Sequence, residues 1–142
     1  MKIRNKVIIS VIHQGQVLLA EGYDPAREFR FYIPVGGGVE FGEKLEAAAL
    51  RELSEELGVT GRAVQYLNFH ESLFEYKGVP EHEIMFHFAC QLDDAARAAL
   101  PETGTESDGE PFAVSWFSKD ELAAVKESLV PPGIYASLQQ QL

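Results

Sequence analysis

Residues 44–57 constrain the fold more than any other part of the chain. This stretch is rich in alanine, leucine, glutamate and arginine, contains neither glycine nor proline, and is followed directly by Gly58. Such a composition is typical of an α-helix that ends at a glycine cap. A helix in a small protein is stabilised mainly by packing one of its faces, so other segments must provide a surface for it.

Several runs rich in β-forming residues predict that this surface is a sheet. Residues 7–12 and 16–20 are expected to form a hairpin. Further strands are predicted at residues 31–33, 59–69, 72–76, 82–92 and 112–117, with short helices after Ser118 and Pro132. Residues 21–30 and most of 93–109 are expected to be loops, and the glycines at 36–38 a turn. This order predicts an α+β fold or α-β-α sandwich with a mixed, mostly antiparallel sheet, as one domain over residues 1–142.

The predicted helix carries a leucine face and a glutamate face. Three leucines fall within an arc of about 60° and are expected to pack on the sheet: Leu50, Leu53 and Leu57. Three carboxylates fall within about 100° of each other, centred on the opposite side: Glu52, Glu55 and Glu56. Crowded like charges destabilise a helix, whereas a divalent cation such as Mg²⁺ or Mn²⁺ would stabilise them. A solvated acidic face is the alternative, and the cluster alone does not exclude it.

Three consecutive glycines, at positions 36–38, lie shortly before the helix. Glycine allows unusual φ angles and close approach of the backbone to a ligand, so this turn could offer a carbonyl oxygen to the same cation. Glu43 suits the positive N-terminal end of the helix. Arg51 can pair with Glu43 or Glu55, although a surface ion pair of this kind contributes little to stability.

The spacing of these residues resembles a known family motif. Gly37 is followed after five residues by Glu43, and after seven more by Arg51-Glu52-Leu53-Ser54-Glu55-Glu56-Leu57-Gly58-Val59. Every fixed position of the Nudix box is matched within residues 37–59. The resemblance implies a Nudix-type α-β-α sandwich and hydrolysis of a diphosphate linkage in a nucleoside diphosphate joined to another group. Many members have proline directly before the glycines, whereas here Val35 lies between Pro34 and Gly36.

The resemblance also implies roles for the motif residues. Glu52, Glu55 and Glu56, with the carbonyl of Gly36, are expected to bind Mg²⁺ or Mn²⁺. Glu52 is expected to lie nearest the nucleophilic water, as a base or as a metal ligand. Glu43 and Arg51 are expected to brace the loop against the helix.

The resemblance further suggests a glutamate ligand from a late loop. Glu110 is the first candidate, with Glu106 and Glu102 as rivals, and an acidic loop in solvent is an equal alternative. The residues that select the substrate are not identified by sequence. Some of the aromatic residues and arginines could face it, or could instead serve core packing and the surface: Phe69, Phe74, Tyr76, Phe86, Arg27 and Arg30. Candidate substrates are nucleoside triphosphates, nucleotide sugars, ADP-ribose and dinucleoside polyphosphates.

Composition narrows the class of partner. The formal net charge of −10 argues against a nucleic-acid polymer, because backbone binding requires clustered lysine and arginine. No apolar run approaches the roughly 20 residues needed to cross a bilayer. We therefore expect a cytoplasmic protein that acts on a small phosphorylated molecule without a membrane, and a homodimer is left open.

Other functions are less compatible with the sequence. A non-catalytic binding or regulatory module of the same fold usually lacks one or more box glutamates, and all are present here. An isopentenyl diphosphate isomerase requires a protonating cysteine, whereas the single cysteine, Cys90, falls in a predicted buried strand. His82 and His87 are one residue too far apart for a zinc-protease HExxH motif and would face opposite sides of a strand.

Overall fold

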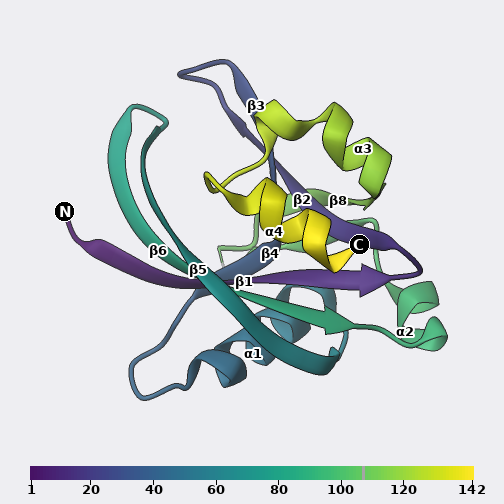
Figure 1. Ribbon diagram of the computed structural model, residues 1–142. Coiled ribbons are helices and arrows are strands. Elements are labelled where there is room, and N and C mark those ends of the chain that lie inside the picture. The colour runs from purple at the N-terminus through teal and green to yellow at the C-terminus, as the bar shows by residue number, and fades with distance from the viewer. Residues whose placement is uncertain (107) are drawn as a thin grey trace.

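Two long strands, β1 (Ile3–His13) and β6 (Val79–Gln91), run parallel to each other through the middle of the protein (Figure 1). The computed structural model describes residues 1–106 and 108–142. The other strands are β2 (Gln16–Asp24), β3 (Phe29–Ile33), β4 (Val35–Gly38), β5 (Arg62–Tyr76), β7 (Thr103–Thr105) and β8 (Pro111–Ser118). The helices are α1 (Leu45–Leu57), α2 (Asp94–Ala99), α3 (Lys119–Ala124) and α4 (Ile134–Gln141), with a 3₁₀ turn η1 (Lys126–Ser128).

The sheet is mixed and mostly antiparallel, which confirms the predicted fold class. Its strand order is β5-β6-β1-β2-β8-β7, with β3 paired to β2 and β4 paired to β1. Within the described residues, β1 and β6 are the one parallel pair of named strands. The predicted hairpin between β1 and β2 is present, with Val11 opposite Leu18 and His13 opposite Gln16.

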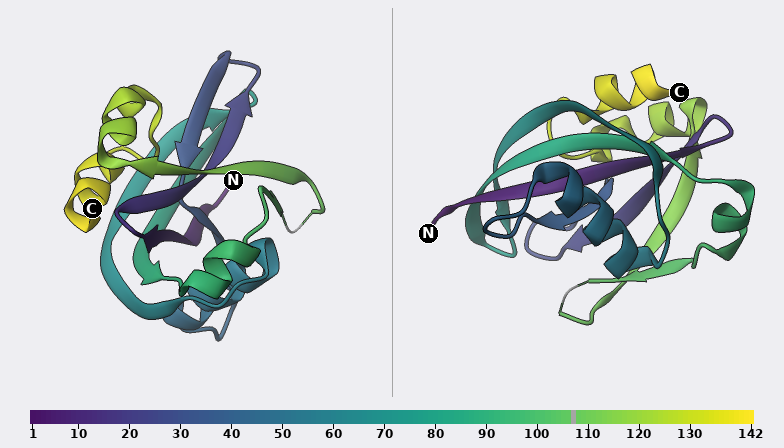
Figure 2. Two further views of the ribbon diagram at one scale, coloured as in Figure 1. Left: turned by 90° about the vertical axis from the view of Figure 1, so that its right-hand side faces the viewer. Right: turned by 90° about the horizontal axis from the view of Figure 1, so that it is seen from below.

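Helices cover both faces of the sheet (Figure 2). Alternate residues of β1 supply the two cores, since successive side chains of a strand point to opposite faces. Val7, Ile9 and Val11 pack with α1 on one face. Ile8 packs on the other face with Leu122 of α3 and with Ile134 and Leu138 of α4. No helix in the described part of the chain is long and apolar enough to span a bilayer.

Several predicted loops are regular structure. Residues 21–24 continue β2 and residues 29–30 begin β3, because these polar segments pair with each other in an antiparallel ladder. Residues 93–109 contain α2, whose cap Asp93 accepts a hydrogen bond from the Ala96 amide at 2.8 Å, and also β7, which pairs with β8. The two strands predicted at 59–69 and 72–76 form one strand, β5.

The glycines at 36–38 are also not a turn. They form β4 together with Val35, and they pair in antiparallel register with Lys6, Val7 and Ile8 of β1. None of the three has a positive φ. Hydrogen bonding to the neighbouring strand therefore holds these flexible residues in an extended conformation.

Candidate functional site

Helix α1 presents two of its glutamates towards the sheet, which corrects the predicted orientation. The buried residues of α1 are Ala48, Ala49, Glu52, Leu53 and Leu57. Leu50, expected in the packed stripe, is only partly buried. The packed face is therefore rotated from the leucines towards Ala48 and Ala49, so that it includes Glu52. Glu52 is 8% exposed, Glu56 is partly buried and Glu55 is exposed.

Strand β4 is the surface on which Glu52 rests. A Cβ atom added at Gly37 would lie 2.5 Å from the carboxylate of Glu52, and one added at Gly36 would collide with the carbonyl oxygen of Val7. At Gly36 the obstacle is backbone, so this position needs a residue without a side chain, whereas at Gly37 it is the end of the Glu52 side chain, which a larger residue would have to displace. The glycines thus bring the backbone of β4 against both β1 and the α1 carboxylate.

Arg51 joins the loop before α1 to the helix. Its Nε and Nη2 donate to the two carboxylate oxygens of Glu43 at 2.7 and 2.9 Å. Its Nη2 also donates to the carbonyl of Gly38 at 3.0 Å, and its Nη1 donates to Glu52 at 2.8 Å and to Glu55 at 3.2 Å. A bidentate guanidinium–carboxylate pair is among the stronger polar contacts in proteins. The bonds from Arg51 lower the pKa of Glu43 to about 2.

Glu56 lies in a concentration of negative charge. Burial, followed by the nearby carboxylates of Glu52, Glu106 and Glu55, raises the pKa of Glu56 to about 8, while Lys6 opposes this rise. Glu106 is the late-loop glutamate that lines the same cavity as Glu56. Glu106 and Glu110 are both exposed, but Glu110 is absent from that lining, so the geometry favours the rival Glu106 over the first candidate. Glu102 is also exposed and outside the lining.

The carboxylates are chemically suited to a hard divalent cation. Several oxygen donors crowd one region, and a cation would offset their mutual repulsion. However, among residues 1–106 and 108–142 no three acidic, histidine or cysteine side chains are already arranged to hold a metal. Arg51 donates hydrogen bonds to Glu52 and Glu55, so a cation held by these two carboxylates would compete with Arg51 for their oxygens.

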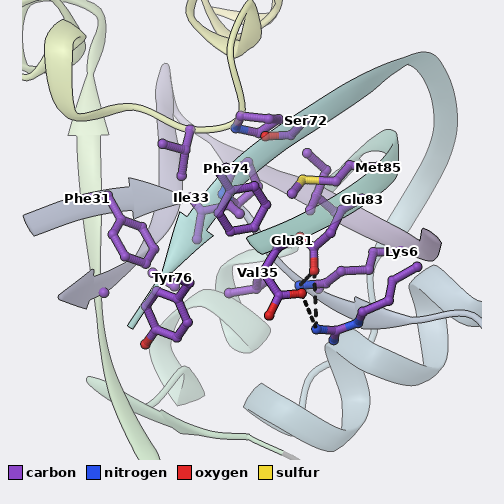
Figure 3. A pocket seen from close by; sticks show the side chains of 18 of the residues that line it. Lys6, Phe31, Ile33, Val35, Ser72, Phe74, Tyr76, Glu81, Glu83 and Met85 are labelled. Carbon is purple, nitrogen blue, oxygen red and sulfur yellow. Dashed lines mark ion pairs between the residues drawn. The ribbon is translucent and has the colours of Figure 1, made fainter. Parts of the chain in front are cut away.

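A cavity of about 600 Å³ is lined both by residues of this acidic region and by aromatic residues. Figure 3 shows three of the aromatic residues, Phe31, Phe74 and Tyr76, on the side of the cavity away from Lys6 and Glu83. Gly36, Glu56 and Glu106 line its acidic end. Five aromatic residues also line it: Phe29, Phe31, Phe74, Tyr76 and Phe112. Of the aromatic residues suggested by sequence, Phe74 and Tyr76 reach the cavity, whereas Phe69 is 60% exposed and Phe86 packs beside the core under α1. Arg27 lines the cavity, but Arg30 does not and pairs with Glu21 instead.

A charged cluster beside the acidic end was not predicted from sequence. Glu83 is only 3% exposed, and its carboxylate lies 3.4 Å from Arg4 and 3.7 Å from Lys6. Arg4 is also 4.0 Å from Glu81, and all four residues line the cavity (Figure 3). The alternating charges of Arg4 and Lys6, and of Glu81 and Glu83, were the available signal. They became meaningful only through the parallel pairing of β1 with β6, which sequence did not predict.

The histidines and the cysteine lie outside the cavity lining. His82 contacts Glu71 at 2.8 Å near the surface. His87 is fully buried between Ser10 and Ser137. Cys90 is 2% exposed, and burial raises the pKa of its thiol to about 12.

Comparison with known proteins places this arrangement in a family. A model of the NUDIX domain matches residues 2–138. The chain is 32% identical over 128 residues to the NAD-capped RNA hydrolase NudC of Mycobacterium bovis. The aligned region covers 82% of this chain and 34% of that protein. It is 39% identical over 79 residues to an RNA pyrophosphohydrolase of Caulobacter vibrioides, which covers 55% of this chain and 44% of the relative. The chain thus spans less than half the length of these relatives.

Solved structures agree on the fold. A MutT NUDIX hydrolase from Burkholderia pseudomallei aligns with a TM-score of 0.65 at 19% identity, covering 100% of this chain and 99% of its own. A MutT protein from Bacillus halodurans aligns with a TM-score of 0.66 at 21% identity, covering 96% and 80%. The domain match covers almost the whole chain and includes the box of residues 37–59, so this protein belongs to the Nudix family.

Proposed function

We propose that this protein hydrolyses a diphosphate linkage in a nucleoside diphosphate joined to another group, with Mg²⁺ or Mn²⁺. One observation carries the proposal: Glu56 of α1 and Gly36 of β4 line the same cavity as a group of aromatic residues, and Glu52 of α1 lies directly against Gly37 of β4. Such a cavity has room for a diphosphate beside a cation and for a planar group beyond it. The candidate substrates are nucleoside triphosphates, nucleotide sugars, ADP-ribose and dinucleoside polyphosphates.

The proposed ligands are oxygen donors at the acidic end. They are the carboxylates of Glu52, Glu55 and Glu56, the Gly36 carbonyl and, from the late loop, Glu106 in preference to Glu110. When bound, the cation would neutralise the diphosphate and lower the pKa of a coordinated water. Glu52 would lie nearest that water, as a base or as a metal ligand, as the resemblance to the family implies. Arg51 and Glu43 would hold the loop in place while Glu52 and Glu55 turn away from Arg51.

Lys6 and Arg4 are proposed to meet the phosphates. Lys6 lies close enough to Glu56 to oppose the rise in its pKa, and it is 3.7 Å from Glu83. Arg4 is about half exposed at the same cluster, with its side chain 48% accessible. Since Glu83 restrains both cations at the cavity, they would enter the complex with little further loss of freedom.

A turnover screen tests the proposal. The wild-type protein, Glu56→Gln and Glu46→Gln would be assayed on each substrate class with Mg²⁺, with Mn²⁺ and with chelator. Glu46 lies on α1 and is exposed, so it is a matched control. We expect turnover that requires metal, loss of nearly all of it in Glu56→Gln, and retention in Glu46→Gln. Near-wild-type turnover by Glu56→Gln, or no hydrolysis of any diphosphate, would reject the proposal.

RNA substrates form a separate arm of this screen. The names of two relatives specify RNA, whereas the net charge of −10 here disfavours a polymer. NAD, NAD-capped RNA and 5′-triphosphate RNA would be compared with the free nucleotides. We expect kcat/KM to be higher for the free nucleotides, and a clear preference for either RNA would replace that part of the proposal.

Two alternatives make different predictions. A non-catalytic module would bind nucleotides without turnover, consistent with the hold of Arg51 on Glu52 and Glu55 in this conformation. An isopentenyl diphosphate isomerase is disfavoured, since Cys90 is buried and outside the cavity lining. Nucleotide binding without hydrolysis in the screen would favour the module.

A further inference from the structure

Two hairpins form the aromatic end of the cavity and supply four of the five aromatic residues that line it; the fifth, Phe112, comes from β8. The β2–β3 hairpin supplies Phe29 and Phe31, and the β5–β6 hairpin supplies Phe74 and Tyr76. Both extend towards the top of Figure 1. Both hairpins join the same sheet through β1, which pairs with β6 and with β2. Within the described residues, however, neither β2 nor β3 pairs directly with β5 or β6, so contacts other than strand ladders set the separation of the two hairpin tips.

One buried carboxylate joins the two hairpins. Asp24, the last residue of β2, is completely buried. Its Oδ1 accepts hydrogen bonds from the amide of Ala26 at 3.0 Å and from the amide of Lys77, in the β5–β6 turn, at 3.1 Å. Its Oδ2 accepts from Nε of Arg27 at 2.8 Å. An uncompensated buried carboxylate would be costly, but three donors, one of them charged, stabilise this one.

The groups held by Asp24 lie at the cavity. Arg27 lines it, and its guanidinium lies 5.0 Å from the centre of the Phe29 ring. Tyr76 is next to Lys77 in sequence, and its ring meets that of Phe31 edge-on, with centroids 6.2 Å apart. Figure 3 shows Phe31, Phe74 and Tyr76 around the same hollow. The Phe31–Tyr76 contact thus depends on the same separation between hairpins that the Asp24–Lys77 bond sets.

We propose that Asp24 is a positioning residue that sets the width of the aromatic end of the cavity, where a planar heteroaromatic ring of the substrate binds. The identity of that substrate rests on the proposed function. The link between the two hairpins rests on the hydrogen bonds of Asp24. Aromatic side chains stack on planar rings, and their contribution depends on the distance between the surfaces. Fixing both hairpins before binding reduces the ordering that the ligand must cause.

Three variants separate the contributions of this carboxylate. Asp24→Ala removes every acceptor. Asp24→Asn keeps an oxygen for the amides of Ala26 and Lys77 but removes the charge that holds Arg27. Asp94→Asn is the matched control, because Asp94 is an exposed carboxylate that contacts His13, away from the cavity. Asp24→Asn also preserves a test if Asp24→Ala does not fold.

The first measurement is hydrogen exchange, which requires no catalysis. We expect the Lys77 amide to exchange about tenfold faster or more in Asp24→Ala, and to stay protected in Asp24→Asn and Asp94→Asn. The second measurement is calorimetric binding of the common nucleoside 5′-diphosphates and of inorganic pyrophosphate, which has no ring. In Asp24→Ala the affinity for the preferred nucleotide should fall about tenfold, with a smaller loss in Asp24→Asn, while pyrophosphate binding is unchanged.

Kinetics complete the test where the wild-type protein is active. For Asp24→Ala we expect KM to rise about tenfold with kcat within about threefold. Unchanged Lys77 exchange, equal losses for nucleotide and pyrophosphate, or no nucleotide binding by the wild-type protein would each overturn the inference. If the protein binds nucleotides in this Asp24-dependent way but hydrolyses no diphosphate, the proposed function is overturned, while the role of Asp24 in linking the two hairpins is supported.

Discussion

The contact between Gly37 and Glu52 shows how the site depends on single atoms. Glu52 comes from a helix face that is buried against β4, and its carboxylate occupies the space that any side chain at position 37 would need. Glycine is usually explained by its freedom at positive φ. Here the backbone is extended, and what matters at this position is the absence of a Cβ atom.

Replacement of Gly37 tests this contact. In Gly37→Ala the new methyl group must displace the Glu52 carboxylate, which it would otherwise approach to 2.5 Å. A shift of about 1 Å in a reacting group commonly costs on the order of 100-fold in rate, so we expect kcat of the proposed hydrolysis to fall by about that factor. Gly38→Ala is the control, because a Cβ atom there meets nothing within 4 Å. Equal kcat values for the two variants would contradict this role of Gly37.

At the scale of elements, the local features were predictable and the pairings were not. The helix, its glycine cap, the capping box at Ser118 and the β1–β2 hairpin depend on residues that are close in sequence, and all are present. The glycines at 36–38 were expected to turn, but they form β4 because β1, about 30 residues earlier in the chain, supplies hydrogen-bonding partners. Residues 21–24 form strand for the same reason, since β3 pairs with them.

The residues of the candidate site also fall into a predictable and an unpredictable group. The box residues lie within 23 consecutive positions, so their spacing could be recognised in one sequence. Lys6, Phe31 and Glu83 reach the cavity from three different strands, and no local pattern joins them. The orientation of α1 was predicted only in part, because the helical wheel followed the leucines. Leu53 and Leu57 are buried as expected, but the buried face also includes Ala48, Ala49 and Glu52 and leaves Leu50 only partly covered.

This orientation of α1 can be tested with two neighbouring alanines. Ala48 is completely buried, and Ala47 is exposed on the same helix. Ala48→Leu should overpack the interface and lower the free energy of unfolding by about 1–3 kcal/mol. Ala47→Leu should change it by less than about 0.5 kcal/mol. Urea unfolding measures both, and similar values for the two variants would mean that α1 packs through a different face.

At the scale of the whole molecule, a buried polar network links the sheet to the last helix. His87 of β6 contacts Ser10 of β1 at 2.6 Å through Nε2, and Ser137 of α4 at 3.1 Å through Nδ1. Asn68 of β5 donates to the same Ser137 at 3.3 Å. The network lies on the face opposite α1, so it stabilises the fold from the side away from the acidic end of the cavity.

Burial of His87 should make the fold sensitive to acid. Burial first, and the neighbouring His70 second, lower the pKa of His87 to about 3, from a usual value of 6.5. The neutral ring contributes fully to stability above pH 6.5, and this contribution is lost progressively as the pH falls towards 3. Between pH 8 and pH 5 the loss is about 2 kcal/mol.

His87→Gln removes this titration while keeping a side chain that can donate and accept hydrogen bonds. Urea unfolding in metal-free buffer would compare the variant with wild type from pH 8 to pH 5. The variant should be less stable at pH 8, and the gap should narrow by about 2 kcal/mol by pH 5, because only the wild type must protonate His87 on unfolding. His82→Gln, near the surface, should follow the wild-type curve. Parallel curves for wild type and His87→Gln would show that the buried imidazole does not govern acid stability.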